Sequence, residues 1–226
     1  VKRVEIFECS CCPPNLNRML AAMGNYTYHI ENGECYVNQY MDSSIEDDGI
    51  SVVQKTNYPY DGEIRIKASG LEKVYLRIPG WCENFDLNKA YAMKNGYAVV
   101  ENDGTEIVLN LVIKPVLIEA NPNVIADSGK AAVMRGPIVY CAESADNIEN
   151  LHSLYLSKEL NAKESYSEFF RAYTIEVDGY RLKGFDGLYQ KLNREYEKCR
   201  IKLIPYYGFA NRGESNMSVW LNFKDE

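Results

Sequence analysis

The spacing of apolar residues near the start of the chain predicts one helix. Between residues 14 and 23 they recur at intervals of three and four positions, at Leu16, Met19, Leu20 and Met23. This spacing places them on one face of an α-helix. Gly24 and Asn25 follow directly and are residue types that commonly end helices. Pro13 and Pro14 fit the first turn, where a missing backbone donor costs no hydrogen bond.

From Tyr26 onward the period changes to two, which is typical of β-strands. The alternating segments 26–30 and 34–40 flank Asn32-Gly33, a pair that favours a two-residue hairpin turn. Further strands are predicted at 50–56, 62–68, 73–78, 97–101 and 106–113. Short strands at this spacing, separated by turn residues, indicate an antiparallel β-sandwich.

The alternation pauses near Asn121-Pro122-Asn123, and we place a domain boundary between residues 124 and 125. Beyond it, strands are predicted at 131–134, 137–142, 169–177, 200–205 and 217–223, with weak helical character at 163–172. The predicted fold is therefore mainly β. It consists of two antiparallel β-sandwich domains, 26–124 and 125–226, preceded by one helix within residues 1–25.

Composition narrows the classes of function. At 226 residues the chain can hold two domains with separate cores, and its 46% hydrophobic content is ordinary. A net charge of −7 argues against a nucleic-acid partner, which requires a basic face. No apolar run reaches about 18 residues, so we expect no membrane-spanning helix. The opening Val1-Lys2-Arg3 is expected to belong to an excised piece, not to a signal peptide.

The seven cysteines form two groups. Four are scattered singly through strand-like segments: Cys35, Cys82, Cys141 and Cys199. A secreted disulfide scaffold would be smaller and denser in cysteine, so we interpret these four as small buried hydrophobes. A reducing, cytoplasmic location is expected to follow. The other three cysteines, Cys9, Cys11 and Cys12, lie together just before the predicted helix.

The adjacent Cys11 and Cys12 carry the candidate chemistry. The start of a helix favours anions, so thiols there ionise more readily and become available as nucleophiles or soft metal ligands. Paired thiolates suit zinc, which takes sulfur, nitrogen and oxygen donors in a tetrahedron. No second ligand pair with zinc-site spacing occurs in the chain. Spacing alone therefore leaves open both a reactive or metal-binding site and a cysteine-rich helix start without function.

The segment from Cys9 to Asn15, followed by Leu16-Asn17-Arg18, resembles the signature of glycoside hydrolase family 127, the β-L-arabinofuranosidases. Four further segments match this family in the same order: 76–81, 119–124, 135–140 and 204–212. The resemblance covers essentially the whole chain but only the C-terminal third of a family member. It implies an (α/α)₆ barrel, with residues 1–25 at its C-terminal edge, followed by two β-sandwich domains.

The resemblance also implies site residues. Family members hold zinc with a glutamate and three cysteines, one of which is the nucleophile. By motif position, Cys11 would be the nucleophile and a zinc ligand, and Cys12 a second zinc ligand. Cys9 lies outside this set. The remaining ligands and the acid/base glutamate belong upstream, because Glu5, Glu8 and Glu31 lack the family context for that role.

Two classes of function stay open. One is a fragment of a retaining hydrolase that uses a zinc-bound thiolate on a small glycoside substrate and is inactive in isolation. The other is a non-catalytic β-module for carbohydrate binding or dimerisation. The lone His29 and His152 are interpreted as structural or solvated, and Glu46-Asp47-Asp48 as a solvated turn. The eighteen tyrosines are interpreted mainly as strand formers.

Overall fold

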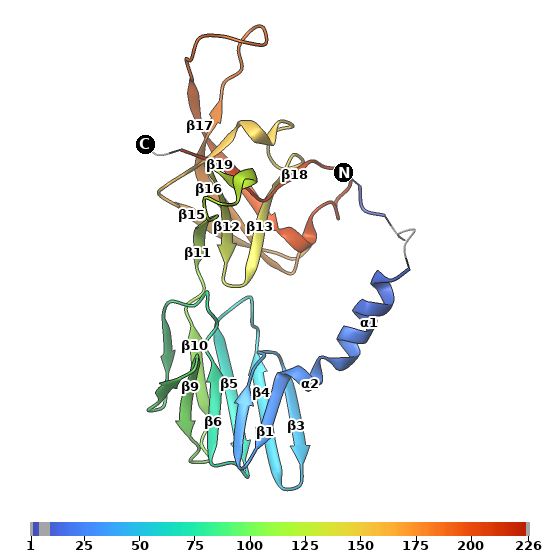
Figure 1. Ribbon diagram of the computed structural model, residues 1–226, viewed down its shortest axis with the longest axis vertical. Coiled ribbons are helices and arrows are strands. Elements are labelled where there is room, and N and C mark those ends of the chain that lie inside the picture. The colour runs from blue at the N-terminus through green and yellow to red at the C-terminus, as the bar shows by residue number, and fades with distance from the viewer. Residues whose placement is uncertain (1, 5–9, 225–226) are drawn as a thin grey trace. The chain divides into compact units, whose positions relative to one another are not determined.

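The computed structural model describes residues 2–4 and 10–224 (Figure 1). Strands dominate, which confirms the predicted mainly-β class. Contacts divide the chain into an N-terminal unit, residues 6–113, and a C-terminal unit, residues 114–226 together with residues 1–5. The division falls before the predicted position at 124/125. Strand β11 (Pro115–Glu119) accounts for the difference, because it pairs with β12 (Lys130–Arg135) of the C-terminal unit.

The N-terminal unit begins with helices α1 (Cys12–Ala22) and α2 (Gly24–Thr27). The predicted helix is present, but it begins two residues earlier than Pro14. The chain does not become extended at Tyr26, because Gly24 begins a second short helix instead of ending the helical segment. Strand β1 (Tyr28–Glu31) starts after it.

Ten strands of the N-terminal unit form two five-stranded sheets around one core. The first sheet has the order β1, β2 (Glu34–Val37), β6 (Lys73–Arg77), β9 (Tyr97–Glu101) and β8 (Ala92–Lys94). The second has the order β3 (Ser43–Asp47), β4 (Ile50–Thr56), β5 (Glu63–Ser69), β10 (Ile107–Leu111) and β7 (Phe85–Leu87). Fully buried side chains come from both sheets, among them Val74 and Leu76 of the first and Ile64 and Leu109 of the second. The β2–β6 pairing is parallel, which departs from the predicted antiparallel arrangement.

The predicted hairpin turn at Asn32-Gly33 is confirmed. The two residues join β1 to β2 with φ angles of 52° and 77°. A two-residue turn of this kind needs positive φ at both positions, which asparagine and glycine tolerate best. Asn95-Gly96 joins β8 to β9 in the same way, with φ angles of 51° and 83°.

The C-terminal unit is one nine-stranded sheet and not a second two-sheet sandwich. After β11 and β12 its strands are β13 (Ile138–Glu143), β14 (Leu154–Ser157), β15 (Ala162–Ser167), β16 (Ala172–Leu182), β17 (Tyr196–Pro205), β18 (Met217–Ser218) and β19 (Leu221–Lys224). Three short 3₁₀ helices lie between them, η1 (Ile125–Asp127), η2 (Leu151–Ser153) and η3 (Tyr206–Gly208). The order β12-β19-β14-β16-β17-β13 closes on itself, because β12 also pairs with β13. The six strands therefore form a barrel, which removes the exposed edges that an open sheet presents.

The helical character predicted at 163–172 is wrong. Residues 162–167 form β15, which pairs with β16 along all six positions. Four of the six are exposed, so this strand lies at the edge of the sheet and has no apolar face for an alternating pattern to reveal. No helix in the described part of the chain is both long and apolar enough to cross a membrane.

Gly179 of β16 lies too close to neighbouring barrel residues to accept a side chain, so a substitution there tests the packing of the barrel. A Cβ there would lie 2.6 Å from Cδ1 of Ile201 and 2.7 Å from the carbonyl oxygen of Tyr155. Gly179→Ala should therefore lower the free energy of unfolding of the C-terminal unit by about 1–3 kcal/mol, as overpacking does. Gly184→Ala is the control, because a Cβ there meets nothing within 4 Å. Urea denaturation measures both, and equal midpoints for the two variants would contradict the packing described.

Candidate functional site

The cysteine pair lies where α1 begins. Cys12 is the first residue of the helix and Cys11 precedes it, and both residues are exposed. Their Sγ atoms are 3.8 Å apart. Cys9, Glu5 and Glu8 lie outside the described residues. Glu31 lies on β1, where its carboxylate is 3.4 Å from Nε2 of His29.

Two other residues of the cysteine motif hold its local geometry. The side-chain amide of Asn15 donates to the carbonyl oxygen of Cys11 at 2.9 Å, and Arg18 donates to Oδ1 of Asn15 at 3.2 Å. Positions four and seven residues after Cys11 share its side of the helix. Neither residue was predicted to have a role, although its spacing from Cys11 places it on that side of the helix. The Asn15 contact holds the Cys11 backbone directly, the Arg18 contact holds the Asn15 side chain, and both thiols stay exposed.

The start of this helix is a poorer anion site than its position suggests. Pro13 and Pro14 follow Cys12 directly, and proline has no backbone N–H. The first three helical positions therefore supply the N–H of Cys12 alone. Stabilisation of a thiolate here would depend on another positive charge more than on backbone donors.

The two thiols fit part of a zinc site. Two sulfurs bound to one tetrahedral zinc, each at about 2.3 Å, lie about 3.8 Å apart, which is the separation of the Sγ atoms of Cys11 and Cys12. Within residues 2–4 and 10–224, however, no group of three or more histidine, cysteine, aspartate or glutamate side chains could hold a metal. The described residues thus bring together two of the four donors that a closed zinc site requires.

The apolar face of α1 is uncovered. Leu16, Met19 and Leu20 are 57–60% exposed, and no residue of the helix is buried. Beside it lies a groove of about 730 Å³, whose lining includes Met19, Met23, Tyr26, Gln39 and Met41. An amphipathic helix normally buries such a face against other protein. The cysteine motif therefore stands on a helix that lacks its cover within the described chain.

The scattered cysteines occupy the cores of both units or lie close to them. Cys35 and Cys141 are fully buried, as predicted, whereas Cys82 and Cys199 are half-buried. Burial raises the pKa of the Cys35 thiol to about 11. Burial also raises the pKa of Cys141 to about 12, and the nearby Glu143 carboxylate adds to that rise. Neither thiol is available for chemistry near neutral pH, and the expected cytoplasmic location stays a prediction.

Comparison with known proteins identifies both units. Residues 34–111 match the profile described as "Beta-L-arabinofuranosidase, GH127 middle domain", and residues 115–222 match "Glycoside hydrolase family 127 C-terminal domain". Two strands that carry family-like segments, β13 and β17, are paired in the barrel, with Tyr140 opposite Pro205. The chain belongs to glycoside hydrolase family 127 and contains the middle and C-terminal domains of that family.

Individual relatives extend the similarity across the cysteine motif. A non-reducing end β-L-arabinofuranosidase of Bifidobacterium longum subsp. longum is 32% identical over 96% of this chain. The crystal structure of a family 127 β-L-arabinofuranosidase from Geobacillus stearothermophilus T6, Ara127N-Se, is 35% identical over 99% of this chain, with a TM-score of 0.87. Another family 127 β-arabinofuranosidase structure is 31% identical, with a TM-score of 0.83. The chain spans 38% of the length of the first relative and 39% of the second.

The difference in exposure between the cysteines predicts a difference in reactivity. A maleimide reagent at pH 7.5 should modify Cys11 and Cys12 at least about a hundredfold faster than Cys35 and Cys141, because burial and raised pKa values suppress an accessible thiolate. Peptide mass spectrometry after timed quenching measures each site, and unfolding in urea should remove the difference. Equal rates in the folded protein would contradict the buried positions of Cys35 and Cys141.

Proposed function

We propose that the full-length protein containing this chain is a retaining glycoside hydrolase that releases L-arabinose from β-L-arabinofuranosides. Cys11 would act as nucleophile and zinc ligand, and Cys12 as a second zinc ligand. The observation that carries this proposal is the pair of exposed thiols, 3.8 Å apart at the start of α1. They lie in a chain whose relatives bear the name β-L-arabinofuranosidase.

The arrangement around Cys11 supports a thiolate nucleophile. A bound zinc would supply the positive charge that keeps the Cys11 thiol ionised at neutral pH. That charge is needed because Pro13 and Pro14 remove two donors from the helix start. The contact from Asn15 to the Cys11 carbonyl holds the backbone while the sulfur faces outward.

The proposed reaction has two displacements. The Cys11 thiolate attacks the anomeric carbon, so a C–S bond forms and the C–O bond to the aglycone breaks. A glutamate outside this chain protonates the departing oxygen. Water, deprotonated by the same glutamate, then attacks the anomeric carbon, and the C–S bond breaks to restore the thiolate. Two inversions give overall retention of configuration.

A non-catalytic role is the second candidate for the isolated chain. The described residues bring together two metal donors, fewer than a closed zinc site requires, yet they form two folded β-units. These two observations favour the non-catalytic role. Such a module would bind carbohydrate or form a homodimer without Cys11 or Cys12. Sedimentation and sugar titration of a Cys11→Ser/Cys12→Ser double variant test it, and loss of either property in the variant would count against it.

The isolated 226-residue chain should be inactive on β-L-arabinofuranosides. The proposal places the acid/base glutamate and two zinc donors outside this chain, so protonation of the leaving group would fail even with Cys11 present. A p-nitrophenyl β-L-arabinofuranoside assay, run beside the full-length protein with added zinc, measures this. Turnover by the isolated chain above the no-protein rate would overturn the assignment of the missing groups.

Replacement of each cysteine in the full-length protein should give separable results. Cys11→Ser should lower kcat by at least about a thousandfold with most zinc retained, because a serine hydroxyl is not ionised at neutral pH and three other donors remain. Cys12→Ser should lose zinc affinity and activity together. Metal analysis beside kinetics measures both, and Cys35→Ser is the control for a cysteine outside the site. Near-normal turnover by Cys11→Ser would show that this residue is not the nucleophile.

A further inference from the structure

The C-terminal unit carries a small polar pocket over three neighbouring strands. Its volume is about 300 Å³, and its lining comes from β14, β16, β17 and the loop that follows β14. Tyr180 of β16 lies opposite Tyr155 of β14 and Lys198 of β17. Ser157 and Asp178 lie two positions along their strands from these tyrosines, so their side chains share the same face. We call this cavity the β14–β16 pocket.

Ser157 is a buried polar residue whose hydroxyl faces this pocket. The residue is 8% exposed, and no hydrogen bond joins its side chain to any described residue. Among the described residues only Gln54 has a fully enclosed side-chain atom without a partner, so the Ser157 hydroxyl stays open to the pocket that it lines. Burying a hydroxyl without a partner costs free energy. A ligand that enters the pocket and bonds to this hydroxyl would remove that cost.

The other polar groups of the pocket carry both signs of charge. Asp178 accepts Nη1 of Arg200 at 2.7 Å, and this contact holds the pKa of the Asp178 carboxyl below its ordinary value. The side chains of Glu159 and Lys198 also line the pocket, and neither forms an ion pair with a described residue. Open carboxylates beside an open ammonium suit a neutral ligand with several hydroxyl groups better than an anion or a cation.

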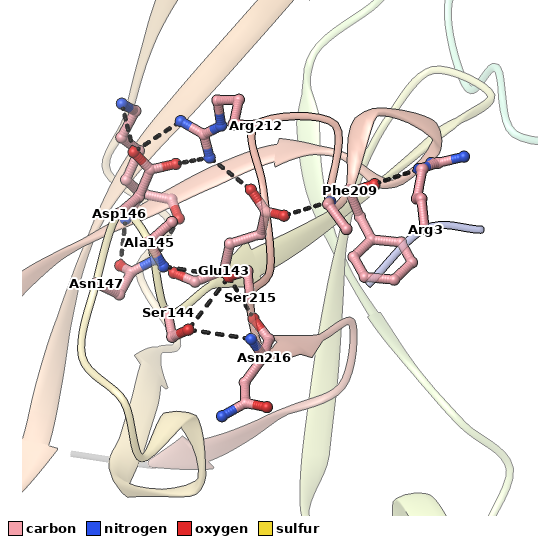
Figure 2. A network of polar contacts seen from close by, with 12 residues as sticks. Arg3, Glu143, Ser144, Ala145, Asp146, Asn147, Phe209, Arg212, Ser215 and Asn216 are labelled. Carbon is pink, nitrogen blue, oxygen red and sulfur yellow. Dashed lines mark hydrogen bonds and ion pairs between the residues drawn. The ribbon is translucent and has the colours of Figure 1, made fainter. Parts of the chain in front are cut away.

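Another polar cluster of the same unit is already saturated. The Glu143 carboxylate is buried, and it accepts the backbone N–H of Ala210 at 2.6 Å and Nη2 of Arg212 at 2.5 Å (Figure 2). Arg3 donates to the carbonyl oxygens of residues 207 and 209, in the loop that these two contacts hold. A ligand here would have to displace internal contacts, whereas the groups of the β14–β16 pocket are open.

We propose that the β14–β16 pocket binds one sugar residue of a carbohydrate. The inference deepens the second candidate function, carbohydrate binding that does not need the thiol pair, and rests on it. Sugar hydroxyls both donate and accept, so one ring can bond to a hydroxyl, two carboxylates and an ammonium at once, those of Ser157, Glu159, Asp178 and Lys198. Tyr180 adds an aromatic ring for the apolar C–H groups of the sugar. A volume of about 300 Å³ is at the small end of ligand pockets, which fits a single ring.

A sugar titration of the ¹⁵N-labelled 226-residue chain tests the site. The probes are L-arabinose, D-xylose and D-galactose, with inorganic phosphate as the anionic probe. At least one sugar should shift the amide signals of Asp178, Gly179 and Cys199 saturably, with a dissociation constant of about 1–10 mM, as for a small ligand held by few hydrogen bonds. Saturable shifts confined to other residues, shifts at these amides with phosphate alone, or no saturable shift with any sugar would overturn the proposal.

Substitutions in the pocket separate binding from folding. Ser157→Ala should raise the dissociation constant by about three- to tenfold, the effect of losing one hydrogen bond. Its thermal midpoint should stay the same or rise, because the hydroxyl has no internal partner to lose. Ser128→Ala removes a hydroxyl outside the pocket and is the control. Equal constants for the two variants, or a lower midpoint for Ser157→Ala with unchanged affinity, would contradict the site.

A charged residue gives an independent check. Glu159→Ala should also weaken binding, whereas Glu168→Ala, which removes an exposed carboxylate outside the pocket, should not. The Cys11→Ser/Cys12→Ser variant should bind the sugar as the unmodified chain does, since neither thiol lines the pocket. Failure of the proposed hydrolase leaves this titration unchanged, and failure of the pocket leaves the kinetics of the cysteine variants unchanged. Binding that maps elsewhere refutes the pocket alone, whereas absence of any sugar binding refutes the second candidate function as well.

Discussion

A closed tetrahedral zinc site takes four donors, and the described residues bring two together, the thiols of Cys11 and Cys12. The proposed function depends on this difference between the four donors required and the two present. The helix that carries the pair presents Leu16, Met19 and Leu20 to solvent, so it requires additional cover as well as additional ligands. Both requirements fit a chain that spans about two fifths of the length of its relatives. The strands of each unit pair within that unit, whereas the cysteine motif supplies two of the four donors that the proposed zinc site would need.

The C-terminal unit contains a fully buried carboxylate, that of Glu143, with a charged and a backbone donor. Burying the Glu143 carboxylate is costly unless charged and backbone donors satisfy it, and Arg212 and Ala210 do so. A hydrophobic replacement of such a pair is often as stable, so stability alone is a weak reason for its presence. What the pair accomplishes geometrically is to fix the loop whose carbonyls receive Arg3.

Local patterns in the sequence predicted local structure well. The period-two segments at 50–56 and 97–101 coincide with β4 and β9, and Asn32-Gly33 forms the expected turn. The period does not specify strand partners, so closure of the barrel was missed, since it joins β12 to β19 across some ninety residues. Strand β15 was missed because its exposed positions carry no apolar alternation.

The sequence predicted which residues form the candidate site, but it did not predict all of the contacts around them. Adjacent cysteines before a helix indicated thiolate chemistry, and the structure places both thiols exposed and close enough to share one ion. The helix start offers fewer backbone donors than its position suggests, because two prolines follow Cys12 directly. The contacts of Asn15 and Arg18 follow helical spacing and could have been predicted. The docking of Arg3 on a loop two hundred residues later depends on three-dimensional placement that no spacing rule reports.

The central claim is that Cys11 and Cys12 are two ligands of a zinc site completed by other parts of the full-length protein. X-ray absorption at the zinc edge of that protein tests it most directly. The account predicts one zinc per chain with three sulfur neighbours at about 2.3 Å and one oxygen neighbour, and loss of two sulfur neighbours or of the metal in a Cys11→Ser/Cys12→Ser variant. A full-length protein without zinc, or with a zinc shell unchanged by the double replacement, would contradict it.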